Sequence, residues 1–194
     1  MGSHRMVTKQ VSFYEEMTNV PFIIAGPGIH PRQKPVEDLL TQPTIDLLPT
    51  LCELAGIPVR SSKPGISLAP FLKGEKQKRQ HPYAASEWHS EYEVTVSPGR
   101  MIRSPRYKYT HYLEGNGEEL YDMLKDKGER RNLAHDPKYS KILAEHRALL
   151  DDYIRRTQDD YRSLKVEADK RWRSHAPGYP NHEGPCARDI INRK

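Results

Sequence analysis

The sequence predicts an α/β protein: the end of a mixed α/β sheet, then a small antiparallel β-sheet with a long C-terminal helix. Three observations predict this fold class. A short, continuously apolar run at residues 20–25 is typical of a buried strand. Short aromatic and β-branched segments, separated by turn residues, follow between residues 83 and 123. A helical apolar periodicity then extends over residues 137–164.

The front of the chain, residues 1–75, predicts one strand and one helix. The strand is VPFIIA at residues 20–25, which a Gly-Pro-Gly turn closes. The helix covers residues 44–55, where Gly56 suits the C-cap and Pro49 is expected to mark the true first turn. Because one strand and one helix cannot complete a parallel sheet, we expect this part to be the last piece of a larger α/β domain.

The back of the chain, residues 76–164, predicts a separate subdomain. Its expected antiparallel strands are residues 83–88, 99–104, 107–113 and 118–123. Asp136 is an expected N-cap and Pro137 an expected first helical residue for the helix at 137–164. Residues 165–194 contain Pro, Gly, Arg and His without periodicity, so we expect an irregular tail.

Composition excludes some classes of partner. The 194 residues include 31 Lys and Arg against 26 Asp and Glu, and acids or turn residues interrupt every basic run. We therefore expect no nucleic-acid partner. No stretch reaches transmembrane length, so we expect no membrane partner. A mean hydropathy of −0.85 is low for a self-sufficient domain, so we expect either that much of the chain is surface or that part of it packs on something absent, such as a missing N-terminal part or, through self-association, a second copy.

His4 and Lys9 are the first candidates for chemistry. A histidine beside an anionic substrate can act as a general acid, and a lysine can bind the oxygens of a sulfate or phosphate. Spacing alone favours a simpler interpretation, in which both residues are solvated near a chain end.

Five segments occur in a fixed order between residues 4 and 134: HRMVTKQVSFYEE, NVPFIIAGPG, TIDLLPTLCELAGIPVR, PGISLAPFLKG and IRSPRYKYTHYLEGNGEELYDMLKDKGERRNLA. In this order they resemble the C-terminal portion of the type I, formylglycine-dependent, arylsulfatase-like sulfatases. The resemblance implies an alkaline-phosphatase-like fold. It also implies hydrolysis of a sulfate ester on a sulfated sugar or an aryl sulfate, and a periplasmic or secreted location.

The resemblance also implies roles for individual residues. His4 matches the active-site histidine that assists the leaving group, and Lys9 matches the lysine that contacts the sulfate. Members of this family use a calcium ion and a formylglycine, which is made from the first residue of a C/S-x-P/A-x-R motif.

The nucleophile motif and most metal ligands do not occur in this chain. Residues 96–100, VSPGR, carry Pro and Arg at the right spacing, but Val stands where Cys or Ser is required. We interpret this match as chance, with a turn at Pro98 and Gly99. Asp38 and Asp46 are better explained as loop and helix-start residues. We therefore predict no metal ligands and no sulfatase turnover from the chain alone.

Trp88 and His89 are candidates for substrate binding. A Trp-His pair at a strand end suits the face and hydroxyls of a sugar, although an ordinary strand-end aromatic is the favoured explanation. The stripe Tyr107, Lys108 and Tyr109 predicts sheet packing, and residues 119–122 predict a structural role.

Three functions stay open. The first is a C-terminal fragment of a sulfatase, catalytic only with its missing part. The second is a non-catalytic interaction or scaffold module derived from a sulfatase, which binds a partner through its exposed α/β edge. The third is a weak polyanion binder, for which a sulfated glycan is the more natural ligand.

Overall fold

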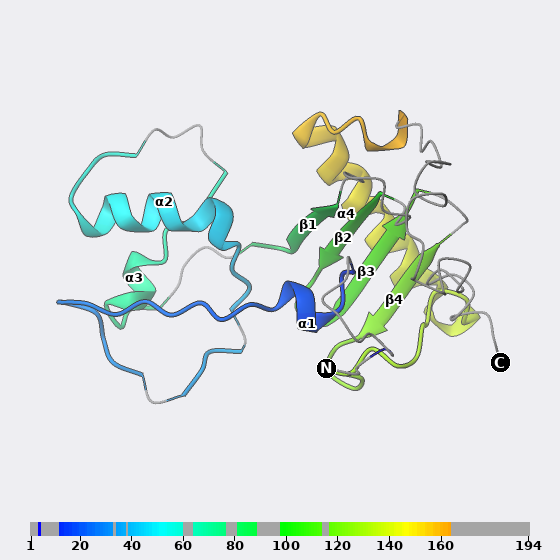
Figure 1. The fold of residues 1–194 in the computed structure, drawn as a ribbon, viewed down its shortest axis with the longest axis horizontal. Coiled ribbons are helices and arrows are strands. Elements are labelled where there is room, and N and C mark those ends of the chain that lie inside the picture. Colours follow the sequence, from blue (N-terminus) through cyan, green and yellow to red (C-terminus); the bar gives the residue numbers. More distant parts are fainter. Residues whose placement is uncertain are drawn as a thin grey trace, which may run out of the picture. The chain divides into compact units, whose positions relative to one another are not determined.

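The computed structural model describes residues 4, 12–32, 34–37, 39–59, 64–76, 81–88, 98–113 and 117–163 (Figure 1). The chain separates into two compact units. Unit 1 comprises Met1–Thr18, Ser86–Ile102 and Arg106–Lys194, and unit 2 comprises Asn19–Ala85 and Arg103–Pro105. Each unit has buried apolar residues of its own, such as Ile102 and Leu120 in unit 1 and Leu68 and Ala69 in unit 2.

A four-stranded sheet is the centre of unit 1. Its strands are β1 (Ala84–Trp88), β2 (Gly99–Arg103), β3 (Tyr107–Tyr112) and β4 (Glu118–Asp122), in the spatial order β1-β2-β3-β4. β3 and β4 are antiparallel, and Lys108 lies opposite Tyr121. Each strand begins and ends within one residue of its predicted limits, which confirms the predicted meander.

The C-terminal helix is shorter than the sequence predicts. A 3-10 turn η2 (Pro137–Tyr139) leads into α4 (Ser140–Thr157), and η3 (Tyr161–Ser163) follows. The predicted cap is confirmed, because the Asp136 side chain accepts a hydrogen bond from the Lys138 amide at 3.1 Å. The expected continuation to residue 164 is wrong, because Gln158 takes a left-handed conformation with φ of 56° and ends the helix.

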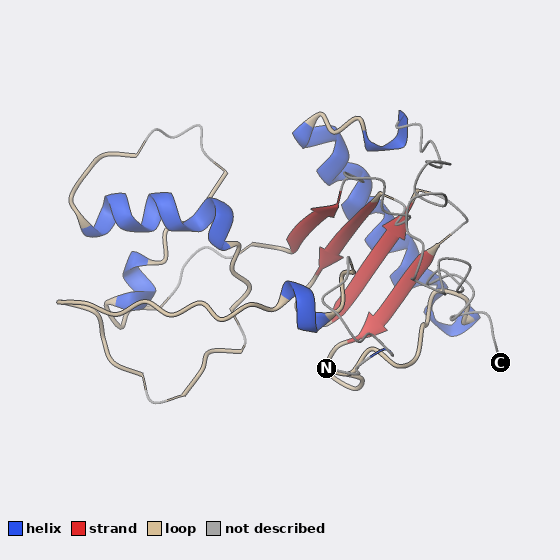
Figure 2. Cartoon of the chain, in the orientation of Figure 1, coloured by secondary structure: helices blue, strands red, loops and turns tan. Residues whose placement is uncertain are grey.

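The two faces of the sheet have different neighbours. Side chains alternate along a strand, so Tyr107 and Lys108 point to opposite faces. The Tyr107 ring meets the His146 ring of α4 edge-on, with centroids 5.8 Å apart. The Lys108 ammonium instead donates to the Phe13 carbonyl at 2.9 Å. The sheet of unit 1 thus has α4 on one face and residues 12–18, including α1 (Glu15–Thr18), on the other (Figure 2).

Unit 2 contains α2 (Pro43–Leu54) and the short α3 (Ala69–Leu72), which contact each other. Residues 20–25 form an extended segment in Figure 1, but no strand is assigned to them. A strand needs a hydrogen-bonded neighbour, and the described residues supply none for this segment, so the predicted strand does not form here. In the described part of the chain, no helix is long and apolar enough to cross a membrane.

Two prolines shape α2. Pro43 stands at its first turn, whereas Pro49 lies inside the helix, so the expectation that Pro49 begins it is wrong. Because proline has no amide hydrogen, the Ile45 carbonyl lacks its usual bond from residue 49. Gly65 lies directly against that carbonyl: a Cβ on Gly65 would be 1.9 Å from the Ile45 oxygen. Only glycine fits this approach.

Candidate functional site

His4 lies against the ring of Tyr14 in unit 1. The ring centroids are 3.6 Å apart and the planes differ by 2°, which is a parallel stack. His4 has a φ of 50°, a left-handed conformation that is uncommon outside glycine and concentrates at functional sites. The His4 Nε2 atom is buried and has no hydrogen-bond partner among the described residues. Since a buried nitrogen without a partner is costly, the ring is a candidate for contact with a substrate.

A buried lysine anchors the segment that carries Tyr14. The Lys108 side chain is 1% exposed, and its ammonium lies 2.7 Å from a Glu15 carboxylate oxygen and 2.8 Å from a Glu129 oxygen. It also donates to the Phe13 carbonyl at 2.9 Å. The other Glu129 oxygen accepts a hydrogen bond from the Glu15 amide at 2.7 Å. Both chain neighbours of Tyr14 are therefore tied to the sheet side of unit 1.

Glu119 lies on the same face of the sheet and is 4% exposed. The Tyr14 hydroxyl donates to its carboxylate at 3.4 Å. Burial, together with the negative charge of Glu129, raises the pKa of Glu119 from 4.5 to about 7. Burial also raises the pKa of Glu129, although the Lys108 ammonium opposes this shift. The cluster therefore holds a carboxyl group that changes charge near neutral pH.

The stability of unit 1 is expected to fall as pH rises from about 5 to about 8. In the folded protein Glu119 keeps its proton up to a pKa of about 7, whereas the unfolded chain releases it near 4.5. The folded state thus binds more protons in this window, and the free energy of unfolding decreases with pH, on the order of 3 kcal/mol at most. Urea unfolding at the two pH values measures this decrease.

A Glu119→Gln variant is the control for that prediction, because glutamine cannot titrate. The wild-type chain should lose more stability between the two pH values than the variant does. Equal losses in both proteins would show that Glu119 does not carry the pH dependence.

One group of side chains could be considered for a metal ion. Single ligand atoms of His4, Glu16 and Glu129 lie within 4.8 Å of one another. Calcium requires several converging oxygen ligands, but this group contains a ring nitrogen. Both Glu129 oxygens are also engaged, one by Lys108 and one by the Glu15 amide. The described residues of this group do not fit a calcium ion.

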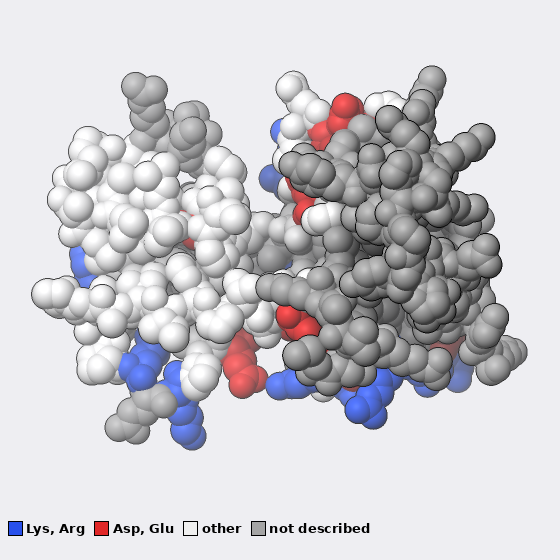
Figure 3. Space-filling model, viewed as in Figure 1, with Lys and Arg blue, Asp and Glu red and all other residues white. Residues whose placement is uncertain are grey.

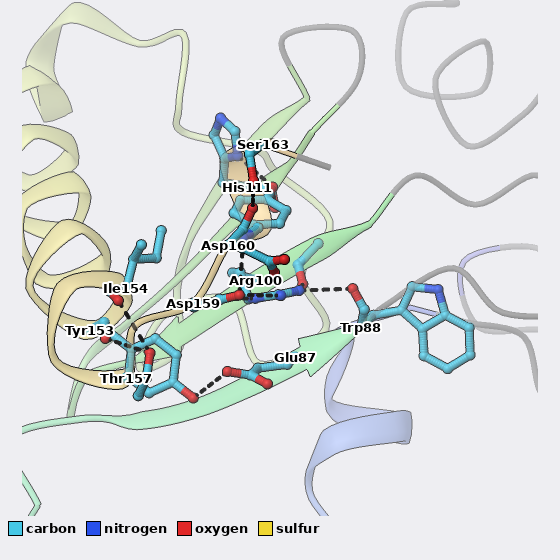
Figure 4. Close-up of polar contacts among 12 residues, drawn as sticks. Glu87, Trp88, Arg100, His111, Tyr153, Ile154, Thr157, Asp159, Asp160 and Ser163 are labelled. Carbon is cyan, nitrogen blue, oxygen red and sulfur yellow. Dashed lines mark hydrogen bonds and ion pairs between the residues drawn. The ribbon is translucent and has the colours of Figure 1, made fainter. Parts of the chain in front are cut away.

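Trp88 lies at the end of β1, beside a buried arginine (Figure 4). The Arg100 guanidinium donates to both carboxylate oxygens of Asp159, at 2.6 and 2.9 Å, and to the Trp88 carbonyl at 2.9 Å. The ring of Tyr161 lies beneath the guanidinium, 4.4 Å from its carbon. This contact set ties the segment after α4 to the sheet and holds the backbone of Trp88, while the indole points away from it.

The predicted site residues differ in how far the structure describes them. His4 and Trp88 belong to unit 1 and are held by separate contacts, His4 by Tyr14 and Trp88 by Arg100. Lys9 and His89 lie outside the described residues, as do Asp38, Val96 and Ser97 of the motifs considered above. The roles of His4, Lys9, Trp88 and His89 stay predictions.

Sequence reasoning missed the contribution of Lys108 and Glu129. A lysine between two tyrosines in a strand was a usable signal, because strand alternation places it on the face opposite the tyrosines. Its carboxylate partners were not predictable, since Glu129 and Glu15 are 114 residues apart in the chain.

Comparison with known proteins shows which family the chain resembles. The chain matches the family described as N-sulphoglucosamine sulphohydrolase, C-terminal, over residues 2–156. A Delta 4,5-hexuronate-2-O-sulfatase of Bacteroides thetaiotaomicron is 76% identical over 194 residues, which are 100% of this chain and 40% of that protein. A choline-sulfatase of Rhizobium meliloti is 36% identical over 138 residues, which cover 66% of this chain and 24% of that protein.

Solved structures agree with these matches. A 2-O GAG sulfatase has a TM-score of 0.83 and 77% identity, covering 97% of this chain and 41% of its own. A protein solved in complex with its substrate D-glucosamine-2-N,6-O-disulfate has a TM-score of 0.55 and 26% identity, covering 62% of this chain and 25% of its own. The fold class and the resemblance are thereby confirmed. The chain, which spans 40% of its Bacteroides relative, belongs to the sulfatase family and corresponds to its C-terminal part.

Proposed function

We propose that this chain supplies the C-terminal part of a sulfatase that hydrolyses a sulfate ester on a sugar, with His4 as the acid that protonates the leaving oxygen. One observation carries this proposal: the His4 ring is held by Tyr14 while its buried Nε2 atom has no partner among the described residues. Two of the matched proteins support the sugar, because one is named a hexuronate-2-O-sulfatase and the other holds a sulfated glucosamine.

Hydrolysis of a sulfate ester gives a task to each of the proposed site residues. Hydrolysis replaces the sulfur–oxygen bond to the sugar with one to an oxygen from water, and the sugar oxygen leaves as a hydroxyl group. His4 supplies the proton that this oxygen takes up. Lys9 balances the charge of the sulfate oxygens, and Trp88 and His89 contact a sugar face. We expect the calcium ion and the formylglycine that the family implies to be held outside this chain.

Unit 2 supplies a docking surface for the rest of the enzyme. Figure 3 shows that uncharged side chains cover most of the visible face of unit 2. Unit 2 also exposes large apolar side chains, among them Val20, Ile23, Leu47, Leu48, Leu51 and Ile57. Ile23 is 87% exposed although it lies in the most apolar run of the chain. Such a surface is typical of a protein–protein interface.

The extended segment at residues 20–25 fits the same partner. It has no strand neighbour among the described residues, and an unpaired apolar strand is a template for pairing with another sheet. This chain matches 40% of the Bacteroides relative, so most of that protein lies outside the match. We therefore expect that part of a sulfatase to pair with residues 20–25 and to cover α2.

A hybrid enzyme tests the proposed function. This chain replaces the matched 40% of the Bacteroides 2-O-sulfatase, and sulfate release from a 2-O-sulfated, 4,5-unsaturated hexuronate disaccharide is measured. The hybrid is expected to release sulfate, and the 194-residue chain alone is expected to release none. His4→Ala should lower kcat of the hybrid by about 10²- to 10⁴-fold, the typical contribution of a general acid.

The matched control is His135→Ala, which removes an exposed histidine from unit 1. This variant should keep the activity of the hybrid. If His4→Ala keeps it as well, His4 is not the acid. If a folded hybrid releases no sulfate from the disaccharide, the proposal that the substrate is a sulfated sugar is wrong.

The alternative is a non-catalytic interaction module. The same apolar surface of unit 2 favours it, because a second copy of this chain could cover those side chains. Sedimentation of the chain at rising concentration, with and without the remaining part of the relative added in trans, separates the two functions. A 1:1 complex that displaces self-association supports the sulfatase part, whereas self-association that the added part does not affect supports the module.

A further inference from the structure

We infer that Tyr14 is a positioning residue for His4, and that the buried Lys108 cluster holds Tyr14 in place. The inference rests on the proposed function, since it concerns the orientation of the proposed acid. It gives a function to the contacts that Lys108, a residue of β3, makes with Phe13 and Glu15 in the segment that follows His4.

The first step is the stack itself. Parallel rings with centroids 3.6 Å apart and planes within 2° limit the rotation of the imidazole to its own plane. A general acid must present its proton within hydrogen-bond distance of the acceptor. The ring of Tyr14 therefore fixes the plane in which the unpartnered Nε2 atom of His4 lies.

The second step is the attachment of Tyr14 at both sides. Its preceding neighbour, Phe13, accepts a hydrogen bond from Lys108 through the carbonyl at 2.9 Å. Its following neighbour, Glu15, donates its amide to Glu129 at 2.7 Å and pairs its carboxylate with Lys108 at 2.7 Å. The backbone at Tyr14 cannot shift without breaking a buried charge-assisted contact.

The third step separates the ring of Tyr14 from its hydroxyl group. The hydroxyl donates to Glu119 at 3.4 Å, which is a long contact. The stack with His4 involves the ring alone. Tyr14→Phe keeps the ring and removes the hydroxyl, whereas Tyr14→Leu removes the stack and keeps an apolar side chain. A positioning role predicts that these two variants differ.

The experiment uses the hybrid enzyme with His4 intact. Tyr14→Phe is expected to keep kcat within about twofold. Tyr14→Leu is expected to lower kcat by about 10- to 100-fold with KM nearly unchanged, since a misplaced catalytic group costs rate rather than substrate affinity. The matched control is Tyr107→Leu, because Tyr107 also makes a tyrosine–histidine ring contact, with His146 at 5.8 Å. This control should lose stability but keep kcat per folded molecule.

A second measurement does not depend on activity. A ring stacked at 3.6 Å shifts the carbon-bound proton resonances of His4 upfield in the NMR spectrum of the full 194-residue chain. A His4→Gln variant assigns these resonances. They should return to ordinary positions in Tyr14→Leu, but not in Tyr14→Phe or Tyr107→Leu.

Three outcomes would overturn the inference. They are an unchanged kcat in Tyr14→Leu, an equal loss of kcat in Tyr107→Leu, or chemical shifts of the His4 protons that stay the same in Tyr14→Leu. None of them touches the proposed function, which depends on His4→Ala. If His4→Ala keeps its activity while Tyr14→Leu loses it, the proposed acid is wrong and the positioning of His4 is wrong with it.

Discussion

Replacing Lys108 with methionine is expected to destabilise unit 1 by about 3–5 kcal/mol, the typical cost of removing one partner from a buried charge cluster. Lys108 is 1% exposed and contacts carboxylates of both Glu15 and Glu129, at 2.7 and 2.8 Å. The variant leaves these charges without a cation and the Phe13 carbonyl without its donor. Urea unfolding of the full chain, followed by tryptophan fluorescence, measures the loss.

Lys141→Met is the control, because Lys141 is an exposed residue of α4. We expect this variant to stay within about 0.5 kcal/mol of the wild type. The double variant Lys108→Met with Glu129→Gln should recover part of the loss, since it removes a charge from each side of the pair. Equal stability of the two lysine variants would mean that the buried cluster contributes nothing measurable.

Replacing Asp46 with alanine is expected to cost about 3 kcal/mol or more in unit 2. The side chain is fully buried and accepts hydrogen bonds from the amides of Gln42 and Ile66, at 2.7 and 2.8 Å. It also contacts the His81 Nε2 atom at 2.7 Å. Alanine leaves three donors without an acceptor, and each unsatisfied buried donor costs about 1–3 kcal/mol.

Hydrogen–deuterium exchange of peptides from residues 39–59 reports on α2 directly and does not require the two units to unfold together. Asp46→Ala should accelerate exchange there. Glu53→Ala, at an exposed position of the same helix, should not. Unchanged protection in Asp46→Ala would show that the three hydrogen bonds do not hold α2 in place.

Local patterns predicted the sheet of unit 1 well. Turn residues bracket each strand, and strands that follow one another in the sequence are neighbours in space, so short-range signals were sufficient. The stripe at Tyr107 and Tyr109 was correctly interpreted as packing, since Tyr109 is 1% exposed. Asp46 was correctly placed at the start of a helix, but its three donors come from separate segments and were not predictable.

Patterns that depend on a distant partner predicted less. The apolar run at residues 20–25 has the composition of a buried strand, but it is extended and unpaired among the described residues because a strand exists only beside another strand. The end of α4 was set by the left-handed conformation of Gln158, and glutamine does not signal that conformation. In the candidate site the role of His4 stays a prediction. Its stacking on Tyr14 was not predicted from the sequence, because only the fold brings the two rings together.

The attachment of the His4 segment also sets an order of events during synthesis. The hydrogen bond from Glu15 to Glu129 joins residues 114 positions apart, and the one from Lys108 to Phe13 joins residues 95 apart. The sheet that receives them is built from consecutive strands and needs no such distant contacts. A growing chain therefore makes His4 before Glu129, and the segment that carries His4 cannot be attached until Glu129 has been added. The proposed acid is therefore synthesised well before the carboxylate to which its segment is attached.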